Sequence, residues 1–122
     1  MKLITFEGIE GVGKSTQINL SKEWLESKGH SVKLLREPGS TKFGEKIREI
    51  LLSTDSNISS NTELLLMFAA RSEMIQSYFN DDAADFILCD RYYHASIAYQ
   101  GYGRGLSLKL INSLIVGLNC PK

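Results

Sequence analysis

The chain has 122 residues and no formal net charge, because 14 Lys and Arg balance 14 Asp and Glu. This length allows one domain with a real hydrophobic core. No basic run suggests a nucleic-acid surface and no apolar run approaches membrane-spanning length, so neither partner is expected. The N-terminus lacks the pattern of a signal peptide, and the two cysteines lack a metal-binding spacing. We therefore expect a reduced, cytoplasmic protein.

The first chemical motif runs from Gly8 to Ser15 and fits the phosphate-binding pattern G-x-x-x-x-G-K-[ST]. It stands between an expected strand over residues 2–7 and an expected helix over residues 15–28. Glycine turns gather backbone N–H groups, and the helix start adds the positive end of its dipole. Lys14 would neutralise the outer phosphates of a nucleotide and Ser15 would bind Mg²⁺. The other loop residues expected to hold the nucleotide are Gly8, Gly11, Val12, Gly13 and Thr16.

A βαβ unit follows from the next elements. Ile18, Trp24 and Leu25 form an apolar stripe on the first helix, and Gly29 is placed to end it. Residues 31–36 read as a second strand. This order predicts an α/β fold with a parallel sheet and a right-handed crossover. Ligands of such sheets bind beyond the carboxyl ends of the strands, so residues that directly follow each strand are the candidates for chemistry.

The second strand runs into the turn Arg36-Glu37-Pro38-Gly39, which carries a charged pair towards that expected crevice. An ordinary surface turn is the alternative reading. A helix is predicted from about Phe43 to Leu52. Arg48 lies off its apolar side, and the spacing leaves open whether Arg48 is a solvated charge or a ligand-binding group.

A longer helix is predicted from Ser60 to about Phe79, with Ser60 as the N-cap and Glu63 completing a capping box. It is apolar nearly all round, so it must be covered on more than one face. Arg71 lies within this apolar setting. A buried arginine needs an acceptor, so Arg71 is either paired in the core or aimed at a ligand, and spacing does not decide between the two.

A third strand is predicted over residues 85–90, with Asp90 at its carboxyl end. An acid in that place is expected to associate with Mg²⁺ in a protein that has a phosphate loop. Arg91 follows at once and could bridge phosphates through two hydrogen bonds. The next segment is rich in aromatic and hydrogen-bonding side chains, and Ser107 is placed to cap a last helix.

Four separated motifs then agree in order and spacing: residues 6–16, Arg36-Glu37-Pro38-Gly39, Phe68-Ala69-Ala70-Arg71, and Asp90-Arg91-Tyr92 followed by residues 98–101. Together they closely resemble the thymidylate kinase family, whose members phosphorylate dTMP to dTDP with ATP and Mg²⁺. The resemblance implies a P-loop nucleoside monophosphate kinase-like three-layer fold with a parallel sheet, and a homodimer. It also implies that this chain is an incomplete kinase domain that stops after the third strand and lacks the lid and the adenine-contacting segment.

The same resemblance implies roles for individual residues. Glu10 approaches the sugar 3′-hydroxyl, Tyr99 crowds the 2′ position, and Arg91 lies between the donor and acceptor phosphates. Arg71 and Gln100 read the thymine ring. Relatives commonly stack a phenylalanine on it from four residues before the arginine, where this chain has Met67, and Phe68 lies three before, so either Phe68 or Met67 packs on the base. The positions that line the monophosphate pocket are Glu37, Pro38, Arg48 and Ser96.

No general base is expected, because the nucleophile is a phosphate oxygen whose second pKa is about 6. Catalysis then rests on positioning and charge compensation, by Lys14, Arg91, Asp90 and Mg²⁺. Two alternatives stand beside this reading. One is a kinase for another deoxynucleoside or nucleotide, and the other is a non-catalytic fragment that binds nucleotide or dimerises.

Overall fold

The structure is a computed structural model of the whole chain. It describes residues 1–8, 13–53, 57–80, 84–96, 101–103 and 105–121, leaving out the side chains of 94 and 95. Apart from a short helix over Tyr93–Ser96 that was not predicted, its elements follow one another as the sequence analysis expects, with most boundaries within a residue or two of the predicted ones. They are β1 (Lys2–Phe6), α1 (Lys14–Ser27), β2 (Val32–Arg36), α2 (Lys42–Leu52), α3 (Ser60–Tyr78), β3 (Phe86–Asp90), α4 (Tyr93–Ser96) and α5 (Leu108–Gly117).

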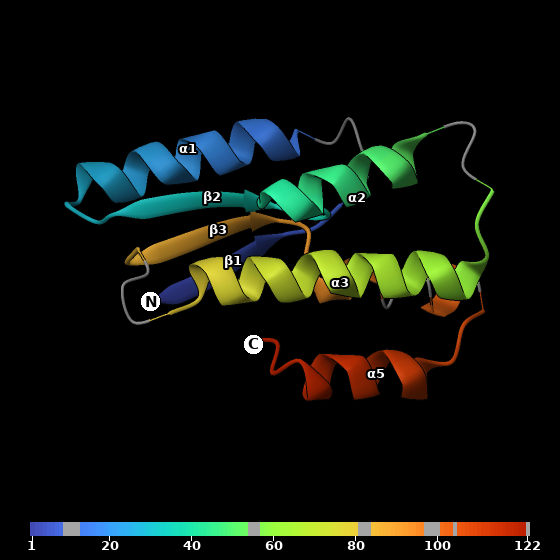
Figure 1. Cartoon of the computed structure of the whole chain (residues 1–122). Coiled ribbons are helices and arrows are strands. Elements are labelled where there is room, and N and C mark those ends of the chain that lie inside the picture. Colours follow the sequence, from blue (N-terminus) through green and yellow to red (C-terminus); the bar gives the residue numbers. More distant parts are fainter. Residues whose placement is uncertain (9–12, 54–56, 81–83, 97–100, 104, 122) are drawn as a thin grey trace.

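The three described strands form one parallel sheet in the order β1-β3-β2. Asp90 is in register with both Phe6 and Arg36, so the carboxyl ends of all three strands lie level. The helix α1 covers one face of the sheet, and α3 covers the other with α5 packed beyond it (Figure 1). This arrangement confirms the predicted α/β three-layer fold with a parallel sheet.

The helix α3 is covered on more than one face, as its composition predicts. Met74 and Ile75 pack in a cluster with Leu35, Ile87 and Cys89, which belong to the sheet. Nearer its start, α3 contributes two further buried side chains to a second cluster with α5, and this cluster is built from Leu64, Phe68 and Ile111. Because side chains alternate between the two faces along a strand, Leu35, Ile87 and Cys89 lie on the face of the sheet that α3 covers.

Small residues, one glycine and two serines, mark the ends of three helices. Gly29 has a φ of 88° directly after the C-cap residue Lys28 of α1, where a glycine is favoured, and Ser107 accepts a hydrogen bond from the backbone N–H of Leu110 at 3.3 Å. The predicted N-cap of α3 is wrong by one residue. Ser59 makes the cap by accepting from the backbone N–H of Thr62 at 3.1 Å, and Ser60 is the first helical residue. Two adjacent serines offer the same cap, and composition cannot choose between them.

The predicted apolar stripe of α1 is also partly wrong. Ile18 and Leu25 are buried, but Trp24 is 61% exposed. Seven residues bring Leu25 back to nearly the same side of the helix as Ile18, whereas Trp24 lies roughly 100° away from Leu25. Residues described in the structure include no helix that is long and apolar enough to cross a membrane.

Gly44→Ala is expected to destabilise the fold. A Cβ at this position in α2 would lie 2.6 Å from the backbone oxygen of Gly39 and 3.0 Å from the hydroxyl of Thr41. We expect a loss of about 1–3 kcal/mol in the free energy of unfolding, measured by urea denaturation. Gly117→Ala is the matched control, because a Cβ there meets no described atom within 4 Å. Equal stability of the two variants would contradict the close packing of α2 on the turn before it.

Candidate functional site

The phosphate-binding motif lies where β1 leads into α1. Gly13 has a φ of 82°, a left-handed conformation that glycine adopts without strain, and no side chain caps the helix that starts after it. The first N–H groups of α1 therefore have no side-chain acceptor among the described residues. A helix start of this kind suits a phosphate. Glu10, Gly11 and Val12 lie outside the described residues.

Lys14 connects the loop to the central strand. Its Nζ lies 2.8 Å from Oδ1 of Asp90 at the end of β3 and donates to the backbone oxygen of Gly8 at 3.4 Å. Asp90 also lines a cavity of about 360 Å³ together with Ser15 and Arg36. The predicted lysine and acid are thus brought together at the carboxyl edge of the sheet, while Thr16 is exposed beside them.

The same cavity bears on the predicted metal site. A serine hydroxyl and a carboxylate, Ser15 and Asp90, line one space. Magnesium favours oxygen ligands and is commonly held by one or two protein groups, with phosphates and water completing its shell. The part of the chain that the structure describes contains no group of three or more His, Cys, Asp or Glu side chains able to hold a metal. Ser15 and Asp90 are oxygen donors of the kind that fits a magnesium ion.

The turn after β3 is fastened to the end of β1. Arg91 has a φ of 71°, and its backbone N–H donates to the oxygen of Phe6 at 3.0 Å. The next N–H, of Tyr92, donates to Oε1 of Glu7 at 3.0 Å. Glu7 was not predicted as a site residue. Its place directly after β1, within the motif of residues 6–16, was the signal that the sequence offered.

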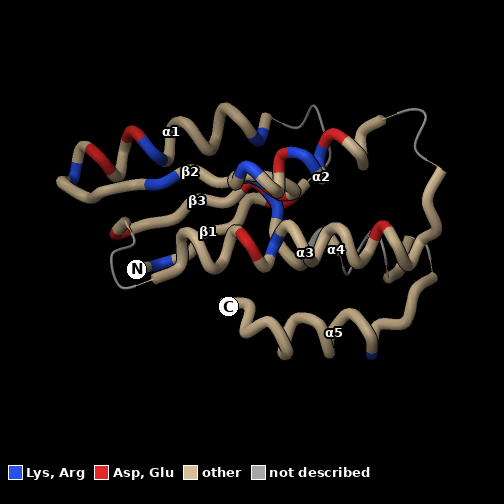
Figure 2. Tube along the Cα trace, in the orientation of Figure 1, with Lys and Arg blue, Asp and Glu red and all other residues tan. Residues whose placement is uncertain are grey.

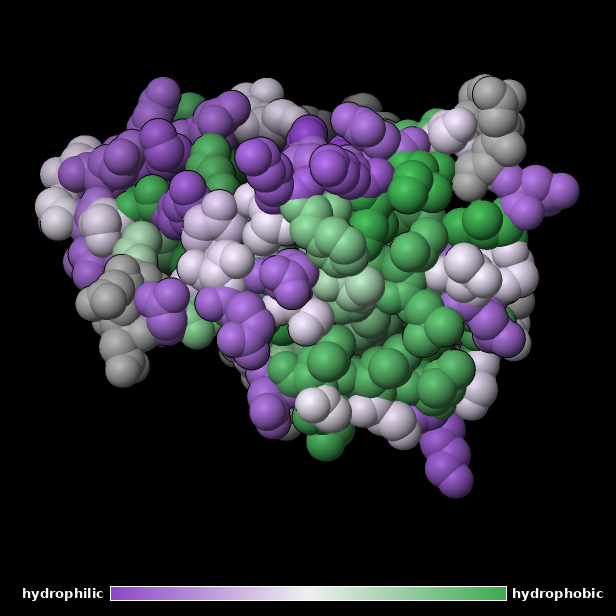
Figure 3. Space-filling view, in the orientation of Figure 1, coloured by the Kyte–Doolittle hydropathy of each residue, from purple (hydrophilic) through white to green (hydrophobic). Residues whose placement is uncertain are grey.

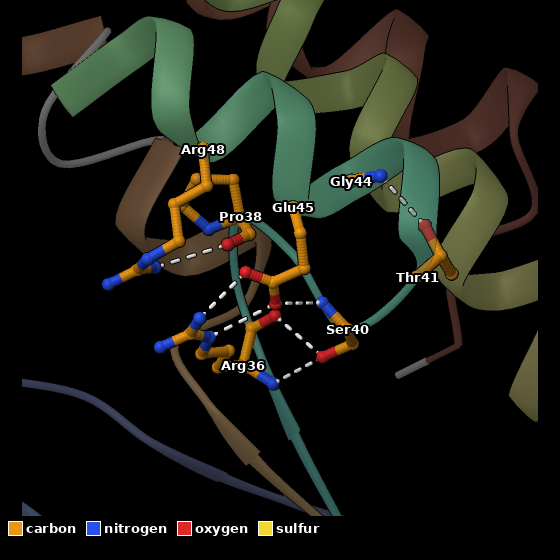
Figure 4. A network of polar contacts seen from close by, with 7 residues as sticks. All are labelled: Arg36, Pro38, Ser40, Thr41, Gly44, Glu45 and Arg48. Carbon is orange, nitrogen blue, oxygen red and sulfur yellow. Dashed lines mark hydrogen bonds and ion pairs between the residues drawn. The ribbon is translucent and has the colours of Figure 1, made fainter. Parts of the chain in front are cut away.

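A polar network shapes the turn between β2 and α2 (Figure 4). Arg36 donates through Nε and Nη2 to the two carboxylate oxygens of Glu45, at 3.2 and 2.6 Å. The backbone N–H of Ser40 donates to the same carboxylate at 2.9 Å. Arg48 donates from Nη1 to the carbonyl of Pro38 at 3.1 Å, so this arginine reaches towards the turn. Glu45 is a second residue that sequence reasoning missed.

These contacts shift two side-chain pKa values in opposite directions. The hydrogen bond from Arg36 is the main cause that lowers the pKa of Glu45, and the N–H of Ser40 lowers it further. The same hydrogen bond raises the pKa of Arg36, and the negative charge of Asp90 adds to the effect. Both ionised forms are therefore favoured in the folded chain.

Arg71 is paired inside the protein. It is only 1% exposed, and its Nε donates to both carboxylate oxygens of Glu37, at 2.9 and 2.5 Å. Its Nη2 donates to the hydroxyl of Ser96 at 3.2 Å, whereas Nη1 has no hydrogen-bond partner among the described residues. Burial raises the pKa of Glu37, and the guanidinium of Arg71 opposes that rise. Pairing in the core is thus observed, and the free Nη1 leaves a role towards a ligand open.

Aromatic rings flank the guanidinium of Arg71. Its central carbon lies 4.5 Å from the ring centroid of Phe68 and 5.7 Å from that of Tyr92. Phe68, the residue predicted to stack on the base, is 2% exposed. The structure therefore brings together Phe68, Arg71, Glu37 and Ser96. Tyr99 and Gln100, the remaining residues predicted to touch the nucleotide, lie outside the described residues.

A phosphate loop before α1, an acid at the end of the central parallel strand and a P-loop lysine between them define an α/β protein of the P-loop nucleotide-binding class. The chain belongs to the thymidylate kinase family, because the family model described as thymidylate kinase matches residues 6–116. The resemblance drawn from the four motifs is therefore confirmed.

Individual relatives agree with this assignment. The chain is 50% identical over 117 residues to the thymidylate kinase of Nostoc punctiforme, covering 93% of this chain and 56% of that protein. It is 52% identical over 116 residues to that of Ruthia magnifica, covering 57% of the relative. The crystal structure of thymidylate kinase from Ehrlichia chaffeensis superposes with a TM-score of 0.85 at 37% identity, over 96% of this chain and 65% of that one. The chain thus spans a little over half the length of its curated relatives.

Glu45→Gln is expected to change how stability depends on pH. Because the folded-state pKa of Glu45 is lowered, its contribution is complete above the unfolded pKa and is lost as pH falls through the folded value. Wild type should exceed the variant in unfolding free energy at pH 7 by up to about 1 kcal/mol, and the two should converge at acid pH. Urea titrations at both pH values measure this difference. Glu49→Gln, an exposed neighbour on α2, is the control, and a pH-independent gap for Glu45→Gln would contradict the account.

Proposed function

We propose that the protein represented by this chain transfers the γ-phosphoryl group of ATP to dTMP in the presence of Mg²⁺, forming dTDP for dTTP synthesis. Membership of the thymidylate kinase family supports this proposal. The observation that carries it is the Lys14–Asp90 pair at the carboxyl edge of the sheet, next to the uncapped start of α1. Because the chain spans a little over half of its relatives, residues 1–122 would form part of the kinase domain.

The phosphates of ATP would lie against the loop and the first N–H groups of α1. Lys14 would exchange its contact with Asp90 for the outer phosphates, and Asp90 is accessible enough for this, since its side chain is 33% exposed. Ser15 and Asp90 would hold Mg²⁺, which compensates negative charge on the transferring phosphoryl group. The residues expected at the phosphates from the family motif are Gly8, Gly11, Val12, Gly13 and Thr16.

The acceptor needs no general base. A phosphate monoester has a second pKa of about 6, so the attacking oxygen of dTMP is largely ionised at neutral pH. The main demand on the protein is to align two anionic groups and to compensate their charge. Lys14 and Arg91 are the cations proposed for this task. The anchoring of the Arg91 backbone to the end of β1 supports a defined position for that residue.

The base and sugar of dTMP would be bound beside Arg71. Arg71 supports this proposal, because its buried Nη1 is a donor that still lacks an acceptor among the described residues. A neutral carbonyl of thymine fits such a donor. The residues proposed through the family motif to complete the base and sugar pocket are Glu10, Phe68, Tyr99 and Gln100. Those proposed to line the monophosphate pocket are Glu37, Pro38, Arg48 and Ser96.

We propose further that the protein is a cytoplasmic homodimer. Apolar side chains gather over α3, α5 and the C-terminal half of α2 (Figure 3), and Leu65 on α3 is 56% exposed. The helix α5 carries a single charge, Lys109, at its start (Figure 2). An apolar face of this kind favours association. Cys89 and Cys120 are both free thiols, which supports a reducing compartment.

Lys14→Met in the whole protein tests the proposed function. Removing the positive charge from the transferring phosphoryl group should lower kcat by about 100-fold or more, with little change in dTMP affinity. A coupled assay of ADP release with dTMP, dUMP, dCMP and thymidine measures both activity and substrate choice. Lys22→Met is the matched control, because Lys22 lies on the same helix and pairs only with Glu26 among the described residues.

The outcomes separate the alternatives. Unchanged turnover in Lys14→Met would remove Lys14 from the reaction. Turnover of thymidine alone, without dTMP, would favour a nucleoside kinase. Binding of dTMP by the 122-residue chain without turnover, restored in the whole protein, would identify the chain as a binding fragment of the enzyme.

A further inference from the structure

The carboxylate of Glu37 is placed unusually for a residue of a substrate pocket. Glu37 lies in the turn after β2, yet it is only 3% exposed, and both its oxygens accept from Nε of Arg71. The two residues are 34 positions apart and belong to different elements. Ser96, from α4, accepts from Nη2 of the same guanidinium at 3.2 Å and is fully buried. Three segments of the chain therefore meet at one arginine.

The contact between Glu37 and Nε of Arg71 leaves the terminal nitrogen Nη1 of the guanidinium available. A carboxylate can pair with a guanidinium across its two terminal nitrogens, but here the carboxylate contacts Nε. Nη1 then has no acceptor in the part of the chain described, although Arg71 is almost completely buried. A buried donor without an acceptor is costly, so a ligand that supplies one gains affinity from it.

Charge decides which kind of acceptor fits. Glu37 already compensates the positive charge of Arg71, and both side chains are at most 2% exposed, so the pair is electrically neutral as a unit. The Lys14–Asp90 pair differs, because the side chain of Asp90 is 33% exposed. A neutral carbonyl oxygen therefore suits Nη1 of Arg71 better than a second anion. The attraction of an anion to a pair without net charge would not offset the free-energy cost of removing that anion from water.

We propose that Glu37 is a positioning residue: it fixes Arg71 through Nε and neutralises it, so that Nη1 is presented to a neutral carbonyl of the bound pyrimidine. This inference rests on the proposed function, since it takes the nucleotide to be dTMP. Glu37 then acts through Arg71 and not by lining the monophosphate pocket itself. Ser96 has the same role at Nη2. This arrangement predicts selectivity for a pyrimidine with a carbonyl at C4, as in thymine, because cytosine carries an amino donor at that position.

Titration calorimetry of the whole protein with dTMP and with dCMP tests the proposal. The quantity compared is the ratio of the two affinities within each variant, because a general loss of folded protein cancels in that ratio. Glu37→Gln keeps the size of the side chain and removes its charge, so the preference for dTMP over dCMP should fall by about tenfold or more. Glu73→Gln, an exposed glutamate two residues after Arg71 on α3, should leave the ratio unchanged.

Each outcome has a definite meaning. An unchanged ratio in Glu37→Gln, with dTMP still bound by wild type, would overturn the positioning role and leave the proposed function intact. Failure of the folded wild-type whole protein to bind dTMP would overturn the dTMP pocket itself, and with it this inference. If Glu37→Gln does not fold, Ser96→Ala decides: a ratio lowered about threefold or more supports the arrangement, and an unchanged ratio overturns it.

Discussion

The ion pair between Arg71 and Glu37 is the contact on which the arrangement of the candidate site depends. It joins the middle of α3 to the turn after β2, and Ser96 adds α4 to the same guanidinium. A buried ion pair is weak evidence for stability, because desolvation offsets much of the attraction. Removing one partner would destabilise the fold, because one uncompensated charge would remain in the core. The pair therefore fixes the relative positions of three segments more than it strengthens the fold. These segments carry five of the residues proposed to bind dTMP: Glu37, Pro38, Phe68, Arg71 and Ser96.

The parallel sheet supplies the second constraint. Asp90 is in register with Phe6 and Arg36, so the phosphate loop, the acid and the charged turn emerge at one edge. Hydrogen bonds between the segments at this edge then hold the turns and their side chains in place. The carboxylate of Glu7 holds the backbone of the turn after β3, and Glu45 holds Arg36. The site is thus built on strand ends and short turns that hydrogen bonds join to one another.

Much of this fold could be predicted from local patterns. The strands, the long helices and the cap at Ser107 follow from periodicity and from residues that favour turns, and the four motifs identified the family. The errors have local causes: Ser59 and Ser60 are equivalent cap candidates, and one residue of helical rotation separates buried Leu25 from exposed Trp24. The choice for Arg71 between a core pair and a ligand could not be made, because its partner Glu37 is distant in the sequence. Burial and Nε geometry exist only in the folded chain.

The central claim is that Glu37 and Arg71 act as one buried unit, and a double-mutant cycle on the free energy of unfolding tests it most directly. Glu37→Leu and Arg71→Met each leave one unpaired charge in the core, and each should cost about 3–5 kcal/mol in urea denaturation. The double variant leaves no such charge, so it should be at least about 2 kcal/mol more stable than the sum of the single effects predicts. Additivity within about 0.5 kcal/mol would contradict the account, because it would mean that the two side chains do not depend on each other.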